Sequence, residues 1–152
     1  MDEVYVNIPG HEKESVQLED YQTSSHEYDE SLLKEYALIS KLRSEVLKVL
    51  ETKRQEGVIG SAQEASVMLN IKDAATKEAF NKFSKVEQER LFIVSKVEWV
   101  DEKLANDMEL SSIDVKENNG HKCERCWNYV DHVTEVDGVH LCNRCLDAIK
   151  EE

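Results

Sequence analysis

The placement of the cysteines constrains this chain more than any other feature of its sequence. All four cysteines form two Cys-x-x-Cys pairs separated by fifteen residues, at positions Cys123, Cys126, Cys142 and Cys145. Two intervening residues allow one tight turn to direct both thiolates to a common point, a pattern typical of a tetrahedral four-thiolate zinc site. Because four protein ligands leave no position for water or substrate, the sequence predicts one structural zinc ion.

Other uses of the four thiols fit less well. Two disulfides would suit a secreted chain, but no signal peptide is recognisable and the other segments lack cysteine. A thioredoxin-like redox switch would need one Cys-x-x-Cys beside a βαβ pattern. His121 and His140 each lie two residues before a cysteine, and we expect both to be solvated. Because metal-bound free thiols indicate a reducing compartment, we expect a cytoplasmic protein.

The charge and the hydropathy pattern narrow the classes of partner. The formal net charge is −13, whereas a domain that binds nucleic acid by itself usually carries a basic patch. Residues 121–152 contain four basic and seven acidic side chains, and four thiolates on one Zn²⁺ add two negative charges. We therefore expect the chain alone to bind nucleic acid weakly. No apolar run approaches the ~20 residues of a membrane span, so we expect no membrane contact.

Residues 29–56 carry the clearest secondary-structure signal, an amphipathic helix with a 3.6-residue period. Its apolar face consists of Leu32, Tyr36, Ile39, Leu42, Val46, Val49 and Leu50. Asp29 is a suitable N-cap, and Gly57 lies where a glycine commonly follows a helix. Such a helix would be about 40 Å long, which is too long for a small domain to cover. We therefore expect its apolar face to pack against other helices.

The sequence after residue 60 predicts a small α+β unit whose sheet is covered on one side by helix. The expected elements are a half-buried strand over 65–71, a helix over 73–83, a short helix over 85–90, a strand over 91–100 and a short strand at 113–115. The helix over 73–83 would bury Ala75, Ala79, Phe80 and Phe83. The strand over 91–100 would place Leu91, Ile93, Val97 and Trp99 on one face, with Trp99 in the core or at its rim.

A turn signal at residues 118–120, Asn-Asn-Gly, marks a boundary before the cysteine pairs. We predict three regions, 1–60, 61–117 and 118–152, in a monomeric chain. The last region is too short to bury a core of its own, so the metal must supply its folding energy, ~10–16 kcal/mol in zinc-finger peptides. Two minor elements are also expected, an extended piece at 15–18 and a short helix over 147–152.

Residues 122–127, Lys-Cys-Glu-Arg-Cys-Trp, and 141–145, Leu-Cys-Asn-Arg-Cys, resemble the carboxy-terminal zinc finger of bacterial-type isoleucyl-tRNA synthetases. Formamidopyrimidine-DNA glycosylases end in the same finger type. Residues 57–65, Gly-Val-Ile-Gly-Ser-Ala-Gln-Glu-Ala, follow a long helix as they do at the end of the synthetase's anticodon-binding helical domain. The resemblance implies that residues 1–60 are the end of that domain. Asn143 stands where the family often has proline, and the ligands are unaffected.

The resemblance implies a parent enzyme that joins isoleucine to its tRNA with ATP, a class I ligase. The class I signatures are absent here, so it implies a non-catalytic fragment whose ATP-binding catalytic domain and editing domain would lie upstream of Met1. Within the finger, Arg125 and Trp127 are the candidate tRNA contacts, because a guanidinium pairs with phosphate or a base edge and an indole stacks on loop bases. Alternatively, Trp127 packs the finger onto the α+β unit and Arg125 is solvated.

Two other classes of function remain open. The first is the zinc-finger tail of a DNA glycosylase, against which the strand pattern at 91–116 argues. The second is a zinc-stapled scaffold whose long helix docks a partner protein. An exposed apolar helix face, together with no effect of Arg125→Ala on RNA, would favour the scaffold.

Overall fold

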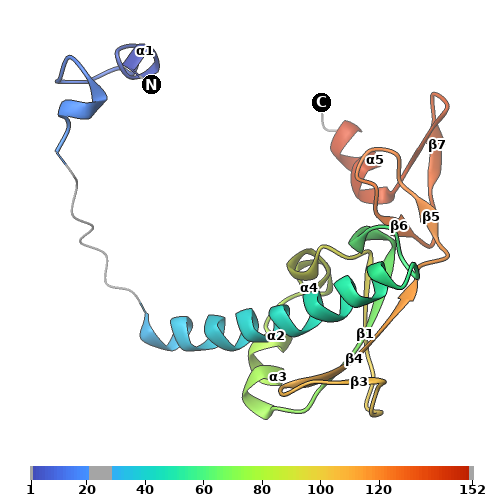
Figure 1. Ribbon diagram of the computed structural model, residues 1–152. Coiled ribbons are helices and arrows are strands. Elements are labelled where there is room, and N and C mark those ends of the chain that lie inside the picture. Colours follow the sequence, from blue (N-terminus) through green and yellow to red (C-terminus); the bar gives the residue numbers. More distant parts are fainter. Residues whose placement is uncertain (1, 21–28, 151–152) are drawn as a thin grey trace.

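The computed structural model describes residues 2–20 and 29–150. A long helix lies across a small sheet, and a knuckle of short hairpins and one helix follows the last strand of that sheet (Figure 1). The predicted α+β class is therefore confirmed. Among the described residues, no helix combines the length and the apolar character that crossing a membrane requires.

Two helical turns make up the described part of the amino-terminal region, α1 (Asp2–Tyr5) and the 3-10 turn η1 (Val16–Leu18). The predicted extended piece at 15–18 is wrong. The Ser15 hydroxyl accepts a hydrogen bond from the Gln17 N–H, so this serine caps a turn.

Helix α2 (Glu30–Gln55) begins and ends at the predicted signals. The Asp29 carboxylate accepts hydrogen bonds from two N–H groups of the first turn. After the helix, Gly57 adopts a φ of 75°, and the Val58 N–H bonds back to the Lys53 carbonyl. Glycine reaches this left-handed conformation without steric cost, which is why the helix stops here.

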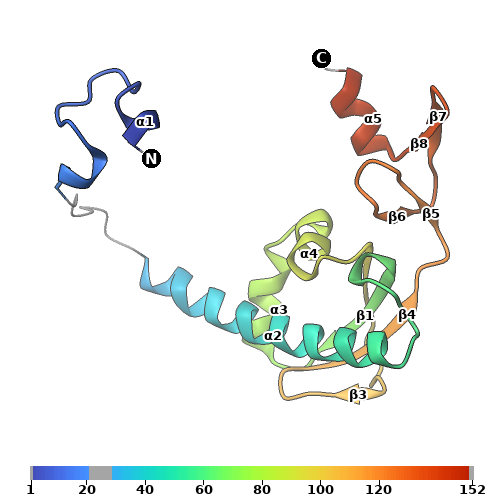
Figure 2. The same cartoon turned by 45° about the horizontal axis from the view of Figure 1, so that its top comes forward.

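The buried side of α2 is shorter than predicted. Its buried residues are Ile39, Leu42, Val46, Val49 and Leu50. Leu32 and Tyr36, which the periodicity placed on the same face, are 49 % and 52 % exposed. The sheet and the following helices cover only the later turns of α2, so the first turns project beyond the core (Figure 2).

Four strands form the sheet in the order β2-β1-β4-β3. They are β1 (Ala65–Ile71), β2 (Lys96–Trp99), β3 (Asn106–Asp107) and β4 (Ser111–Glu117). β1 is central, because it pairs in parallel with β2 and antiparallel with β4. A 3-10 turn, η2 (Ala62–Glu64), precedes β1. The parallel pair requires a crossover, which two helices provide.

The crossover consists of α3 (Ala74–Asn81) and α4 (Lys85–Phe92). Both helices were predicted, and the strict alternation of β1 is also confirmed by its burial pattern. Ala79 and Phe80 are buried as predicted, but in the first turn of α3 the buried position is Thr76 rather than the predicted Ala75, which is exposed. The reason is the N-cap Asp73, whose carboxylate accepts bonds from the N–H and the hydroxyl of Thr76.

The predicted strand over 91–100 is wrong in its first half. A capping box at Ser84 starts α4, and the helix continues through Phe92, which is fully buried. Ile93 then adopts a left-handed conformation with a φ of 60° and is 54 % exposed, and β2 begins only at Lys96. Leu91 and Ile93 flank Phe92, the last residue of α4, and this spacing of apolar residues resembles the alternation of a strand.

One aromatic cluster and one carboxylate connect these elements. The Phe80 ring lies 5.5 Å from Phe92 and 5.3 Å from Trp99, between ring centroids, so Trp99 lies at the rim of the core as predicted. Glu45 of α2 accepts hydrogen bonds from the Leu110 N–H at 2.8 Å and the Ser111 hydroxyl at 2.6 Å. These bonds fasten α2 to the start of β4.

Residues 121–150, which we call the knuckle, contain two hairpins and a helix. The hairpins pair β5 (His121–Lys122) with β6 (Tyr129–Val130) and β7 (Thr134–Val136) with β8 (Val139–Leu141). Helix α5 (Asn143–Lys150) starts before the predicted residue 147, directly after Cys142 and with Cys145 in its first turn, and residues 151–152 of the predicted helix lie outside the described residues. α2 and the sheet share one buried cluster, and the knuckle has another. The division at residues 60 and 117 stays a prediction.

Candidate metal centre

Two turns carry the four cysteines. Cys123 follows β5 and Cys126 closes the turn after it, in which the Trp127 N–H bonds to the Cys123 carbonyl at 2.7 Å. Cys142 follows β8, and Cys145 lies in the first turn of α5. Each pair therefore begins directly after a strand, and the tight turn that follows directs both sulfurs of the pair toward the same point.

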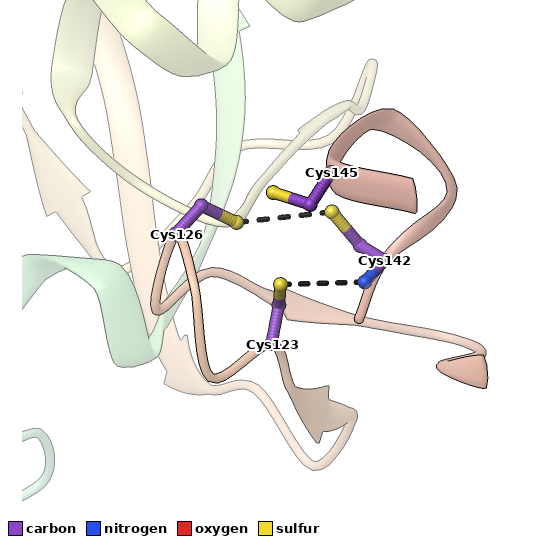
Figure 3. Close-up of side chains that lie close together, drawn as sticks. All are labelled: Cys123, Cys126, Cys142 and Cys145. Atoms are coloured by element: carbon purple, nitrogen blue, oxygen red, sulfur yellow. Dashed lines mark hydrogen bonds between the residues drawn. The ribbon is translucent and has the colours of Figure 1, made fainter. Parts of the chain in front are cut away.

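The four sulfur atoms converge on a common point (Figure 3). They all lie within 4.8 Å of one another, and the Sγ atoms of Cys126 and Cys142 are 3.8 Å apart. Tetrahedral zinc with ~2.3 Å Zn–S bonds requires sulfurs about 3.8 Å apart. A disulfide would require ~2.05 Å, and all four thiols are free. The residues present therefore fit one tetrahedral zinc ion.

Backbone N–H groups favour the thiolate form of one ligand. The Cys142 N–H points to the Cys123 sulfur at 3.3 Å. Burial opposes ionisation of Cys123, but N–H groups, including those of Cys126 and Cys142, lower its pKa to about 6. Burial dominates at Cys142 and raises its pKa to about 12 in the metal-free chain. Because zinc binds thiolates, metal binding at this site would release the Cys142 proton.

A reciprocal pair of hydrogen bonds joins the two turns. The Glu124 N–H donates to the His140 carbonyl at 3.0 Å, and the His140 N–H donates to the Glu124 carboxylate at 2.7 Å. The side chains of His121 and His140 are exposed, as predicted, and neither belongs to the cluster of potential metal-binding groups found among the described residues.

The two candidate RNA-contacting side chains lie on the surface of the first turn. Arg125 is exposed, and Trp127 is 60 % exposed and belongs to neither buried cluster. Trp127 has a left-handed φ of 65°, and the Lys122 ammonium lies 5.5 Å from the centroid of its ring. The turn thus displays an indole and two cations beside the sulfur cluster.

Sequence reasoning missed one side chain beside the sulfurs. Arg144 and Cys126 both line a hollow of about 360 Å³ between α4 and the knuckle. Burial of the Arg144 guanidinium opposes its charge, but the sulfur of Cys126 raises its pKa overall. A positive charge at this place partly offsets the excess negative charge of four thiolates on Zn²⁺. Its position between two cysteines was the signal available in the sequence.

Comparison with known proteins agrees with this site. Residues 120–148 match the family described as "Zinc finger found in FPG and IleRS". The family match and the four neighbouring sulfurs support a structural zinc ion.

The whole chain is also similar to longer proteins. It is 35 % identical to an isoleucine–tRNA ligase of Macrococcus caseolyticus over 99 % of this chain and 16 % of that protein. It is 37 % identical to an isoleucine–tRNA ligase of Thermotoga petrophila over 100 % of this chain and 17 % of that protein. With an isoleucine–tRNA ligase of Staphylococcus aureus, the identity is 38 % over 98 % of this chain and 16 % of that protein. The chain thus spans about one sixth of the length of these relatives. It is similar along its whole length to part of these isoleucine–tRNA ligases, and its residues 120–148 match a zinc-finger family that takes its name in part from such enzymes.

Proposed function

We propose that this chain is the tRNA-binding C-terminal region of an isoleucine–tRNA ligase, a class I enzyme that uses ATP to join isoleucine to its tRNA. The observation that supports this proposal is the similarity to isoleucine–tRNA ligases along the whole chain. The chain itself is non-catalytic in this proposal. Adenylate formation and editing belong to other parts of the ligase, and this region contributes a surface near the anticodon end of the tRNA.

We propose that the four cysteines are the ligands of a single zinc ion: Cys123, Cys126, Cys142 and Cys145. Their sulfur separations and their burial support this assignment. When bound, zinc supplies a cross-link between the two turns and performs no chemistry on a substrate, because the protein fills all four coordination positions.

We infer that Trp127 and Arg125 contact the tRNA. A non-glycine residue in the left-handed conformation costs roughly 1–2 kcal/mol, and the turn adopts this conformation at Trp127 while its indole is 60 % exposed. Stacking a base on an exposed aromatic ring contributes ~1–3 kcal/mol, and the Arg125 guanidinium can pair with a phosphate or a base edge. An acidic chain attracts phosphate poorly at long range, so these contacts act locally, within a larger complex.

The test uses the ligase that contains this chain, carrying Trp127→Ala or Arg125→Ala. Loss of one stacked base predicts a roughly 5- to 150-fold lower kcat/KM for tRNA charging. ATP–pyrophosphate exchange with isoleucine should be unchanged, since no tRNA is needed for that step. Val139→Ala, an exposed change on the neighbouring hairpin, is the control. Unchanged charging by both variants with intact zinc would remove the contact role.

We further propose that the protein is cytoplasmic and that this chain is a monomer. Four free thiols that require a reduced state support the first statement. Sedimentation equilibrium of the zinc-loaded chain tests the second, with a mass of 17.5 kDa expected at micromolar concentration.

A second candidate, a protein-docking scaffold, is favoured by the exposed apolar side chains in the first turns of α2, Leu32, Leu33 and Tyr36. Two variants distinguish the two functions. A scaffold predicts that Arg125→Ala leaves tRNA charging unchanged, whereas Leu33→Glu weakens attachment of this region to its protein neighbour.

A further inference from the structure

Few contacts join the knuckle to the rest of the fold, α2 and the sheet with its crossover helices, which we call the sheet unit. Their buried clusters are separate, and no ion pair in the described part of the chain links residues 2–117 to residues 121–150. Three hollows of about 360, 220 and 340 Å³ are lined by residues of both units. Apolar packing therefore does not determine how the knuckle is oriented.

Between the described residues of 2–117 and those of 121–150 there is a single hydrogen bond, and it ends on Ser95; in the connecting residues, the Asn118 N–H donates to the Glu64 carbonyl at 2.7 Å. The Tyr129 N–H, at the start of β6, donates to the Ser95 hydroxyl at 2.6 Å. The same hydroxyl donates to the Gln63 carbonyl in η2 at 2.5 Å. A hydroxyl has one proton and two lone pairs, so it can make both bonds at once. Donating to Gln63 directs the lone pairs of Ser95 toward the knuckle.

The chain holds this hydroxyl rigidly. Ser95 follows the left-handed residue Ile93 and the buried residue Val94, which is 2 % exposed, so its backbone is fixed just before β2. On the acceptor side, the Glu64 carboxylate receives hydrogen bonds from the Gly60 N–H at 2.8 Å and the Ser61 hydroxyl at 3.3 Å. Ser95 and its acceptor Gln63 therefore both belong to well-defined turns of the sheet unit.

We propose that Ser95 is a positioning residue that sets the orientation of the zinc knuckle on the sheet unit. Tyr129 lies two residues after Trp127, so the relay also sets the direction in which the indole faces. Neither hydrogen bond of Ser95 involves a cysteine sulfur, and zinc binding does not depend on it. The inference about orientation depends only on these contacts, whereas a role of that orientation in RNA contact rests on the function proposed above.

The test compares Ser95→Thr, which keeps the hydroxyl, with Ser95→Val, which has the same shape without it, and with Ser95→Ala. Ser44→Ala is the control, because the Ser44 hydroxyl bonds only within α2, to the Ser40 carbonyl. Residual dipolar couplings of the zinc-loaded 152-residue chain report the relative orientation of the two units. The wild type, Ser95→Thr and the control should fit one alignment tensor.

The valine and alanine variants should need separate tensors for the two units, with one zinc ion still bound per chain. The Tyr129 amide should exchange roughly five- to tenfold faster, as the loss of one hydrogen bond predicts. A common tensor and unchanged Tyr129 exchange in both variants would overturn the proposal. Unfolding of the sheet unit in both variants would also overturn it, because the hydroxyl would then act on the core.

Charging by the ligase with Ser95→Ala separates this inference from the proposed function. Altered orientation with lower kcat/KM for tRNA supports both. Altered orientation with unchanged charging leaves the positioning role standing and removes the RNA contact from the knuckle.

Discussion

Removing zinc should unfold the knuckle and leave the sheet unit folded. Besides its cysteines, the knuckle buries one side chain, Leu141, which is 5 % exposed, and Val130 and Val136 pack against it partly buried. Such a small apolar cluster contributes only a few kcal/mol of hydrophobic stabilisation, too little to order the knuckle by itself. Zinc contributes an apparent ~10–16 kcal/mol in comparable peptides. Without the metal, the conformational-entropy cost of ordering the knuckle therefore exceeds the stabilisation that its buried side chains provide.

The assay is amide hydrogen exchange of the whole chain before and after chelation. Protection should disappear in β5 to β8 and α5 and persist in β1 and β4, whose side chains belong to the larger cluster. Cys145→Ser should have the same effect through weaker zinc binding, whereas Val139→Ala, an exposed position on the same hairpin, should not. Persistent protection of the knuckle strands in the zinc-free chain would refute the reasoning.

Three further predictions concern the sheet unit. Glu45→Ala leaves a buried N–H and the buried Ser111 hydroxyl without their acceptor, so urea denaturation should show a loss of ~1–3 kcal/mol per group. The half-buried control Glu35→Ala, which loses one ion pair with Lys82, should cost less than ~1 kcal/mol. Phe80→Ala empties the centre of the aromatic cluster and should cost ~3–5 kcal/mol by the same measurement. Hydrogen bonds from two lysines lower the pKa of Asp107 to about 2, so its stabilisation is full above its ordinary pKa near 4 and is lost as the pH falls through 2. Melting temperatures between pH 6 and pH 2 should therefore fall less steeply for Asp107→Asn, and equal slopes would contradict the assignment.

Local chemistry made much of the fold predictable from the sequence. Asp29 and Gly57 mark the ends of α2 because a carboxylate satisfies free N–H groups and glycine tolerates a positive φ. The cysteine spacing predicted the convergence of the sulfurs for a similar reason, since a tight turn brings neighbouring ligands together. Such features depend on a few adjacent residues, and a linear sequence displays them directly.

Features that depend on distant neighbours were not predictable. The exposure of Leu32 and Tyr36 follows from where the sheet ends, which the period of a helix does not encode. The left-handed conformation of Ile93 was not predicted, because the apolar residues at 91–94 resembled a strand and not the end of a helix. Ser95 could not be found at all, because its partners are separated from it by 32 and 34 residues and its role exists only after both units fold.

The fold of the knuckle and its orientation thus have different determinants, and two perturbations can separate them. Chelation removes the cross-link between the turns, so it should abolish protection inside the knuckle and its fixed orientation together. Ser95→Ala removes the hydrogen bonds to Tyr129 and Gln63 but none within the knuckle, so protection inside the knuckle should persist while its orientation averages. If the local contacts of Trp127 and Arg125 require a fixed orientation, the two perturbations should weaken tRNA charging in the same sense. A knuckle that still supports normal charging when it is folded but no longer fixed would show that charging does not depend on RNA contact by the knuckle.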